Sequence, residues 1–109
     1  MEIDRELMKG SVSLLLLSLL SRGEMYGYEI FQEAARRSDH AFEFKDGTLY
    51  PALHLLEKKG LVKAAWRTGD NGRERKYYSL TSGGKKAARE YERQWRHLTG
   101  AVKTVLESR

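Results

Sequence analysis

The chain has 109 residues, a length that suits a single domain with a modest core. It has no cysteine, which excludes disulfide frameworks, cysteine nucleophiles and thiolate metal sites. Its longest apolar run, residues 14–20 interrupted by Ser18, is too short to span a bilayer. The run also lacks the basic front and small-residue cleavage site of a signal peptide. We therefore expect a soluble, cytoplasmic protein that makes no membrane contact.

The net charge of +5 is unevenly distributed along the chain. Residues 1–44 carry five basic and eight acidic side chains, whereas residues 45–109 carry fifteen basic and seven acidic ones. Seven of the basic residues lie between positions 58 and 76, where two residues are acidic. A basic segment beside an acidic one favours a polyanionic partner such as nucleic acid. Charge clustering on a solvated surface would give the same asymmetry.

The first element predicted from the pattern is a helix over residues 4–21. Its apolar residues recur at helical spacing and form one face: Met8, Val12, Leu15, Leu16, Leu19 and Leu20. Asp4 is the predicted N-cap and Gly23 the predicted stop. Gly10 is either a weak point inside this helix or the residue at which it starts.

Two further helices are predicted, over residues 26–37 and 46–59, with residues 38–45 forming the loop between them. The apolar stripe of the third helix has the spacing i, i+3, i+4 and i+7, at Leu49, Ala52, Leu53 and Leu56. Pro51 fits the first turn of a helix, where its missing N–H has no partner to lose, and this places the start between residues 46 and 48.

A two-stranded hairpin follows the third helix. Residues 62–67 alternate, as do residues 75–80, in which Tyr78 and Leu80 share one face. Residues 68–72 (TGDNG) contain the Asp-Asn-Gly sequence that tolerates positive φ, as a hairpin turn requires. We expect Trp66, on the first of these strands, to pack in the core.

The last predicted helix covers residues 81–107 and carries a heptad seam. The seam residues alternate in steps of three and four: Ala88, Tyr91, Trp95, Leu98, Val102 and Val105. Such a seam needs a partner helix, and self-association supplies one most economically. We therefore expect a homodimer.

This order of elements describes a winged helix-turn-helix. The predicted fold class is mainly α with a small two-stranded antiparallel hairpin and a long C-terminal dimerisation helix. Residues 1–80 would form the DNA-binding domain and residues 81–109 the dimerisation helix. In this fold the third helix enters the major groove of double-stranded DNA, and the hairpin reaches the backbone or the minor groove.

Three motifs resemble the PadR family of bacterial transcriptional repressors. Residues 47–57 (GTLYPALHLLE) are similar to the family's recognition helix, residues 26–30 (YGYEI) to its second-helix motif and residues 72–81 (GRERKYYSLT) to its wing. The likeness extends over residues 7–106 and implies a homodimeric winged-helix DNA binder. Residues 45–46 (KD) depart from the small residue and proline that the family commonly has there. Gly83 stands where the family often has glutamate, which leaves a capping box from Thr81 incomplete and the start of the last helix open.

DNA contact is expected from the start of the third helix, from the wing and from the start of the second helix. Thr48 and Tyr50 would contact phosphate and His54 a base edge. The alternative is an ordinary solvated surface, and Tyr28 fits the core equally well. The residues assigned to DNA are Tyr26, Tyr28, Lys45, Thr48, Tyr50, Pro51, His54, Arg73, Arg75 and Lys76.

Trp95 occupies a central seam position, where a flat indole fits a tight two-stranded seam poorly. It is either an aromatic of the dimer core or a platform on which a small planar aromatic ligand stacks, an arrangement that resembles short PadR-like drug sensors. The residues assigned to this interface are Met8, Val12, Ala88, Tyr91, Trp95, Leu98, Val102 and Val105.

No enzyme motif is evident in the sequence. The three histidines lack metal-ligand spacing, and no catalytic triad pattern or complete phosphate loop is present. We expect no cofactor and no metal. The leading hypothesis is a PadR-like repressor that binds a palindromic operator and is released by an aromatic effector. The alternative is a winged-helix protein-interaction module without specific DNA binding.

Overall fold

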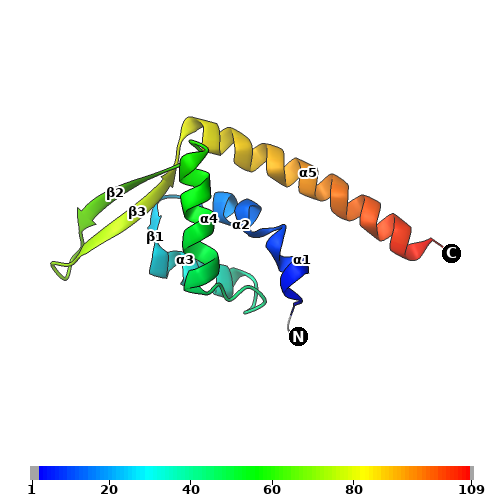
Figure 1. Cartoon of the computed structure of the whole chain (residues 1–109), viewed down its shortest axis with the longest axis horizontal. Helices are drawn as coiled ribbons and strands as arrows, with labels where there is room; N and C mark the ends of the chain where they lie inside the picture. The colour runs from blue at the N-terminus through cyan, green and yellow to red at the C-terminus, as the bar shows by residue number, and fades with distance from the viewer. Residues whose placement is uncertain (1–2, 109) are drawn as a thin grey trace.

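Five helices and one small sheet make up residues 3–108, the part of the chain that the computed structural model describes (Figure 1). The helices are α1 (Arg5–Lys9), α2 (Val12–Leu20), α3 (Gly27–Arg37), α4 (Asp46–Lys58) and α5 (Ser82–Glu107). The strands are β1 (Met25–Tyr26), β2 (Val62–Thr68) and β3 (Glu74–Leu80). The β2–β3 hairpin and α5 project in opposite directions from the packed helices (Figure 1). The predicted winged-helix class with a long C-terminal helix is confirmed.

The N-terminal helix is broken, so the prediction of one helix over residues 4–21 is wrong. α1 ends at Lys9 and α2 begins at Val12. Gly10 has low helix propensity, and the Ser11 hydroxyl donates a hydrogen bond back to the Met8 carbonyl at 2.8 Å. The predicted cap is confirmed, because the Asp4 carboxylate accepts a hydrogen bond from the Glu6 N–H at 2.9 Å.

The core forms where α2 meets α3, α4, α5 and the sheet. Leu16 and Leu17 are adjacent in sequence and both fully buried, because α2 is covered on more than one side. The other fully buried large side chains are Ile30, Leu49, Leu53, Leu56 and Val62. The apolar stripe predicted for the third helix is therefore its buried face.

The loop between α3 and α4 contains two residues in the left-handed region, Asp39 (φ 52°) and His40 (φ 65°). The His40 N–H donates to the Ala35 carbonyl at 2.8 Å, which ends α3 tightly. α4 starts at Asp46, within the predicted window. Pro51 lies in the second turn of α4 instead of the predicted first, because the helix begins five residues before it.

The sheet has three antiparallel strands in the order β1-β3-β2, not the two that the sequence predicts. β1 has two residues, too few for an alternation signal, and pairs Met25 with Tyr78 and Tyr26 with Tyr77. The β2–β3 register places Ala64 opposite Tyr78 and Trp66 opposite Lys76. The predicted hairpin and its alternation are confirmed, with Tyr78 and Leu80 on the buried face. We call residues 62–80 the wing.

The start of α5 is seated against the start of β2. The helix begins at Ser82, and the Thr81 hydroxyl accepts a hydrogen bond from the Gly84 N–H at 3.0 Å. The same hydroxyl donates to the Gly60 carbonyl at 2.7 Å, and the Thr81 N–H donates to the Leu61 carbonyl at 3.1 Å. Thr81 is therefore an effective cap even though the glutamate of a capping box is absent.

Residues 3–108 include no helix that is both long and apolar enough to cross a membrane. In this part of the chain no group of three His, Asp or Glu side chains could hold a metal ion. Within the same residues, each buried side-chain nitrogen or oxygen has a hydrogen-bond partner.

Candidate nucleic-acid interface

The surface of α4 that faces away from the core is exposed and mostly polar, with Leu55 as an exposed apolar residue among its polar groups. Because Leu49, Leu53 and Leu56 turn inward, Thr48, Pro51 and His54 lie on the open side of the helix, as the sequence predicted for residues that contact a duplex. Lys45 is also exposed, at the N-cap position of α4.

Tyr50 joins the start of α4 to the start of α3. A Cβ placed on Gly27 would lie 2.3 Å from the Tyr50 hydroxyl oxygen, so any larger residue there would force the Tyr50 side chain to move. The Tyr50 ring also meets Phe31 edge-on, with centroids 6.3 Å apart. Burial raises the pKa of Tyr50, and the Asp46 carboxylate and Tyr78 raise it further. The side chain is still 43% exposed, so one edge of the ring remains on the surface.

The start of α3 presents Tyr26 and Tyr28 differently. Tyr26 is half-buried as the N-cap, and its N–H donates to the Glu29 carboxylate at 3.2 Å. Tyr28 is 61% exposed, so the alternative that it lies in the core is wrong. Its ring stands on the surface at the N-terminal end of α3, where unpaired backbone N–H groups favour an anion.

One face of the wing carries a row of alternating arginines and tyrosines. The Arg75 guanidinium lies 4.4 Å from the centroid of the Tyr26 ring, and Arg67 lies 5.7 Å from that of Tyr77. The two rings meet edge-on at 5.5 Å. Arg67 also forms an ion pair with Glu24. Arg75 was assigned to DNA from the sequence, but Arg67 was not. The alternation of β2 and β3 places Arg67 on the same face as Arg75, and this was the sequence feature that could have identified it.

The tip of the wing places Arg73 in the open. Gly72 adopts φ 77°, as the predicted turn requires, and the Arg73 N–H donates to the Asn71 side-chain oxygen at 3.1 Å. The Arg73 carbonyl accepts from the Gly69 N–H at 2.7 Å. These bonds hold the turn, and the Arg73 side chain is exposed beside it.

The opposite face of the wing is the one that the helices cover. Tyr78 on this face is 5% exposed, and its burial, followed by the nearby Glu57 carboxylate, raises its pKa. Lys76 lies further out with its Nζ 5.5 Å from the Tyr78 ring centroid. Trp66 is 66% exposed, so the expectation that it packs in the core is wrong. The wing extends beyond the helices that would have covered it.

The eight residues assigned to the dimer and effector interface differ in how far their own chain buries them. Trp95, Leu98, Val102 and Val105 are exposed along α5, whereas Ala88 and Tyr91 pack partly against the protomer's own core. Val12 is 6% exposed inside that core and offers no surface to a partner. Helical periodicity places Val12 on the apolar stripe correctly but does not show which element covers that stripe.

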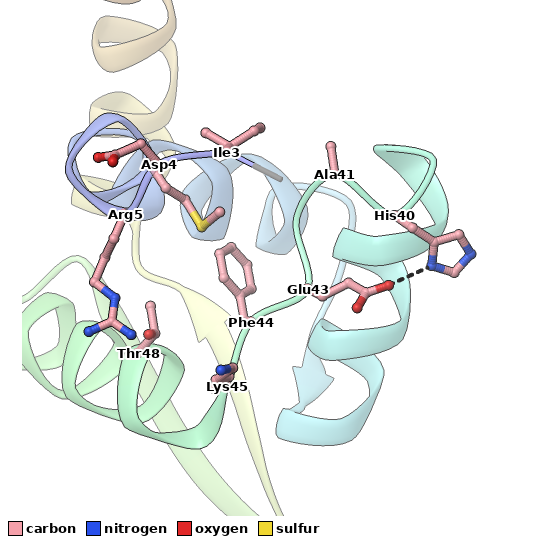
Figure 2. Close-up of a pocket in the computed structure, with 10 residues that line it drawn as sticks. Ile3, Asp4, Arg5, His40, Ala41, Glu43, Phe44, Lys45 and Thr48 are labelled. Atoms are coloured by element: carbon pink, nitrogen blue, oxygen red, sulfur yellow. Dashed lines mark hydrogen bonds and ion pairs between the residues drawn. The ribbon is translucent and has the colours of Figure 1, made fainter. Parts of the chain in front are cut away.

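Two surface pockets flank the helices. One of about 430 Å³ lies between α2 and α5 and is lined by Gly10, Ser13, Leu14, Tyr91, Gln94, Trp95 and Leu98. The other, of about 780 Å³, lies between α1 and the start of α4 (Figure 2). Figure 2 shows the pair of His40 and Glu43, 3.1 Å apart, on the side away from Arg5 and Thr48. Met8 lines this second pocket and not the one beside Trp95.

Comparisons with known proteins agree with this arrangement. Residues 16–90 match the model of the transcriptional regulator PadR-like family. The chain is 36% identical to transcriptional regulator Rv3488 of Mycobacterium tuberculosis, over 90% of this chain and 88% of that one. It is 32% identical to an uncharacterised protein of Lysinibacillus sphaericus, over 94% of each.

Solved structures show the same similarity in three dimensions. A transcriptional regulator from Clostridium thermocellum superposes with a TM-score of 0.83 at 30% identity, covering 94% of this chain and 96% of that one. A PadR family transcriptional regulator from Eggerthella lenta superposes with a TM-score of 0.81 at 36% identity, covering 95% and 88%.

Proposed function

Because the chain belongs to the PadR-like family of transcriptional regulators, we propose that it is a homodimeric repressor that binds a palindromic operator. The observation that carries this proposal is the open polar face of α4 standing beside a basic wing. Residues 62–80 contain five basic and two acidic side chains. A helix for the major groove and a cationic hairpin for the backbone are the two parts that a winged-helix head needs. Occupancy of the operator by such a dimer would exclude the transcription machinery.

Each part of the head has a distinct role in the proposal. α4 inserts its start into the major groove, with His54 at a base edge and Thr48 on phosphate. Lys45, Tyr50 and Pro51 flank that contact. The wing places Arg73, Arg75 and Lys76 on phosphates, and Tyr26 and Tyr28 hold a phosphate at the start of α3. Residues 1–80 would act as the DNA-binding unit and residues 81–109 as the dimerisation helix.

Dimerisation through α5 is supported by its exposed apolar row. Trp95, Leu98, Val102 and Val105 follow one another at heptad spacing, and each remains more than one third exposed. A second α5 would bury this row. The two heads would then lie at a fixed separation, matching half-sites about one helical turn apart.

The pocket beside Trp95 supports a ligand-sensing role for this dimer. Its walls are mainly apolar, with Ser13 and Gln94 as polar groups, and Trp95 is 39% exposed there. A small planar aromatic molecule that stacks on this indole would change the packing of α5 against α2. Repacking at this position would alter the separation of the heads and lower affinity for the operator.

The test of DNA binding is a fluorescence-anisotropy titration with the DNA upstream of the protein's own gene, at several salt concentrations. Sequence-preferring, salt-dependent binding is expected. The double substitution Arg73→Ala with Arg75→Ala should weaken binding to all duplexes and reduce the salt slope by about 0.9 per lost phosphate contact. The matched control is Arg93→Ala with Arg96→Ala, which removes the same charge from exposed positions on α5. An unchanged slope in the wing variant would show that the wing assignment is wrong.

Light scattering tests the dimer. The expected mass is that of two chains, and Leu98→Glu with Val102→Glu should give one chain by placing charges in the seam. A monomeric wild-type protein with only weak, sequence-independent DNA affinity would support the protein-interaction module instead.

Ligand sensing is tested in a Trp66→Phe background, in which Trp95 is the single indole. Planar cationic dyes should quench its fluorescence at micromolar concentration and weaken operator binding. A dimer in which Trp95 stays unaffected by every dye would show that the seam is closed to ligands.

A further inference from the structure

Trp66 is an exposed indole on the face of the sheet whose inner end is buried. It shares that face with Val62 and Ala64, because side chains alternate along a strand. Tyr78 lies opposite Ala64 and is 5% exposed, whereas Trp66, two residues further out, is 66% exposed. Two residues of strand span about 7 Å, so the helices stop covering the sheet abruptly between these two positions. An exposed indole offers a partner a large apolar ring to pack against.

The residue directly opposite Trp66 is a cation. Lys76 is its partner on β3, so the two side chains stand side by side on one face. The Lys76 ammonium is held 5.5 Å from the Tyr78 ring centroid, which restrains it next to the indole. We define this pair, Trp66 and Lys76, as the wing platform.

The wing platform lies on the same side of the sheet as α4. α4 packs against β2. The buried Tyr78 is one step inward from the platform and lies close to α4. It contributes to the raised pKa of Tyr50, and the Glu57 carboxylate contributes to the raised pKa of Tyr78. The arginine–tyrosine row of Arg67 and Arg75 lies on the reverse side of the sheet. Figure 1 shows the hairpin projecting beside α4. Trp66 and Lys76 are therefore on the side of the wing that α4 packs against, and Arg67 and Arg75 are on the other side.

We propose that the wing platform is a DNA contact in which the Trp66 indole packs on the deoxyribose and base edges of the minor groove while Lys76 binds the adjoining phosphate. This inference rests on the proposed function and adds to it a residue with an apolar, salt-independent role. On the platform's own face the Lys76 ammonium is complementary to a DNA phosphate, and Arg73 adds a second positive charge at the exposed turn beyond it. A second copy of this chain would bring the same positive charge to the platform, so DNA is the better occupant.

The contact should be visible in the fluorescence of Trp66. In a Trp95→Phe variant Trp66 is the single indole, and anisotropy first measures the binding of this variant to a double-stranded operator fragment. Acrylamide should quench Trp66 freely in the protein alone and several-fold less in the complex. In the matched Trp66→Phe variant, Trp95 should show the same quenching with and without DNA.

Affinity measurements separate the two halves of the platform. Trp66→Ala should weaken binding by roughly tenfold and leave the salt slope unchanged, because an indole releases no counterion. Lys76→Ala should lower the slope by about 0.9. Trp66→Phe, which keeps an aromatic ring, should fall between wild type and alanine. Because Trp66 is largely exposed, its substitution should leave the circular-dichroism spectrum and the melting temperature unchanged.

Two results would overturn the platform while leaving the proposed function intact. One is DNA binding by anisotropy with equal quenching of Trp66 in the free and bound states. The other is an indole already shielded before DNA is added, which would show that a second copy covers it. No DNA binding at all would overturn the proposed function together with the platform. Oxidative footprinting of the unaltered chain, in which Trp66 and Trp95 fall in different tryptic peptides, gives the same readout without any substitution.

Discussion

Replacing Gly84 with alanine should displace the start of α5 from its seat on β2. A Cβ at this position would lie 1.9 Å from the Leu61 carbonyl oxygen, 3.0 Å from the Leu61 carbonyl carbon and 3.3 Å from the Leu80 Cβ. The nearest atoms belong to the backbone, so no side-chain rotation relieves the overlap. An ordinary close contact between carbon and oxygen is about 3.3 Å, and the helix must therefore move away by more than about 1 Å.

The displacement acts on identified interactions. The Thr81 N–H bond to the Leu61 carbonyl and the Thr81 hydroxyl bond to the Gly60 carbonyl both cross this junction, and each contributes about 1 kcal/mol. Overpacking of a close-fitted junction adds about 1–3 kcal/mol of strain. The better helix propensity of alanine restores about 1 kcal/mol. We therefore expect a loss of about 2–4 kcal/mol, which lowers the melting temperature by about 10–20 °C.

Urea unfolding followed by circular dichroism measures this loss, at one fixed protein concentration because the stability of the proposed dimer would depend on concentration. The control is the neighbouring glycine. A Cβ on Gly83 would meet nothing closer than 3.6 Å, so Gly83→Ala keeps the junction and should raise stability by about 0.5–1 kcal/mol. Opposite signs at adjacent glycines are the expected signature. If Gly84→Ala proved as stable as Gly83→Ala, the close approach of α5 to Leu61 would be wrong.

Three further predictions concern backbone conformation, packing and pH. Asp39→Gly should stabilise the protein by about 0.5–1 kcal/mol in thermal melts, because Asp39 has φ 52°, whereas Asp39→Ala should give no gain. Gly27→Ala should lower the free energy of unfolding by about 1–2 kcal/mol, because its Cβ would lie 2.3 Å from the Tyr50 hydroxyl. In a Tyr50→Ala background the same substitution should cost much less. Equal costs in both backgrounds would contradict the contact. Burial raises the pKa of Tyr78, so the folded state holds the phenolic proton more tightly than the unfolded state. The free energy of unfolding should therefore be unaffected below about pH 10 and should fall as pH rises through the folded pKa. Urea unfolding across this pH range should show a smaller fall in Tyr78→Phe.

The elements that the sequence predicted well are those in which periodicity and stop signals agree. α4 combines a four-residue apolar stripe with Gly60 beyond its end, and the wing combines alternation with a glycine that needs positive φ. The likeness to the PadR family, drawn from three motifs, is confirmed by the family match. In each case local chemistry and tertiary packing favour the same structure.

The misses arise where burial depends on something outside the local pattern. Alternation placed Trp66 on the correct face of β2 but contained no information about where α4 stops covering that face. Periodicity likewise placed Val12 on an apolar stripe without showing that its own chain covers it. β1 is two residues long and is defined only by its pairing with β3. The helix breaks at Gly10, where the Ser11 hydroxyl donates a hydrogen bond to the Met8 carbonyl. The spacing of apolar residues carries no information about such side-chain bonds to the backbone.

Because α5 is anchored only near its start, a small rotation there moves its far end by a larger distance. With 26 residues α5 is about 39 Å long, and its packing against the core ends near Tyr91, within its first half. A tilt of about 5° at the Thr81 joint would swing the far end through about 3 Å. Substitutions at Thr81 and its contacts would therefore change the distance between the two DNA-binding heads of the proposed dimer in small steps. Operator spacing would then change without the substitution of any residue that touches DNA.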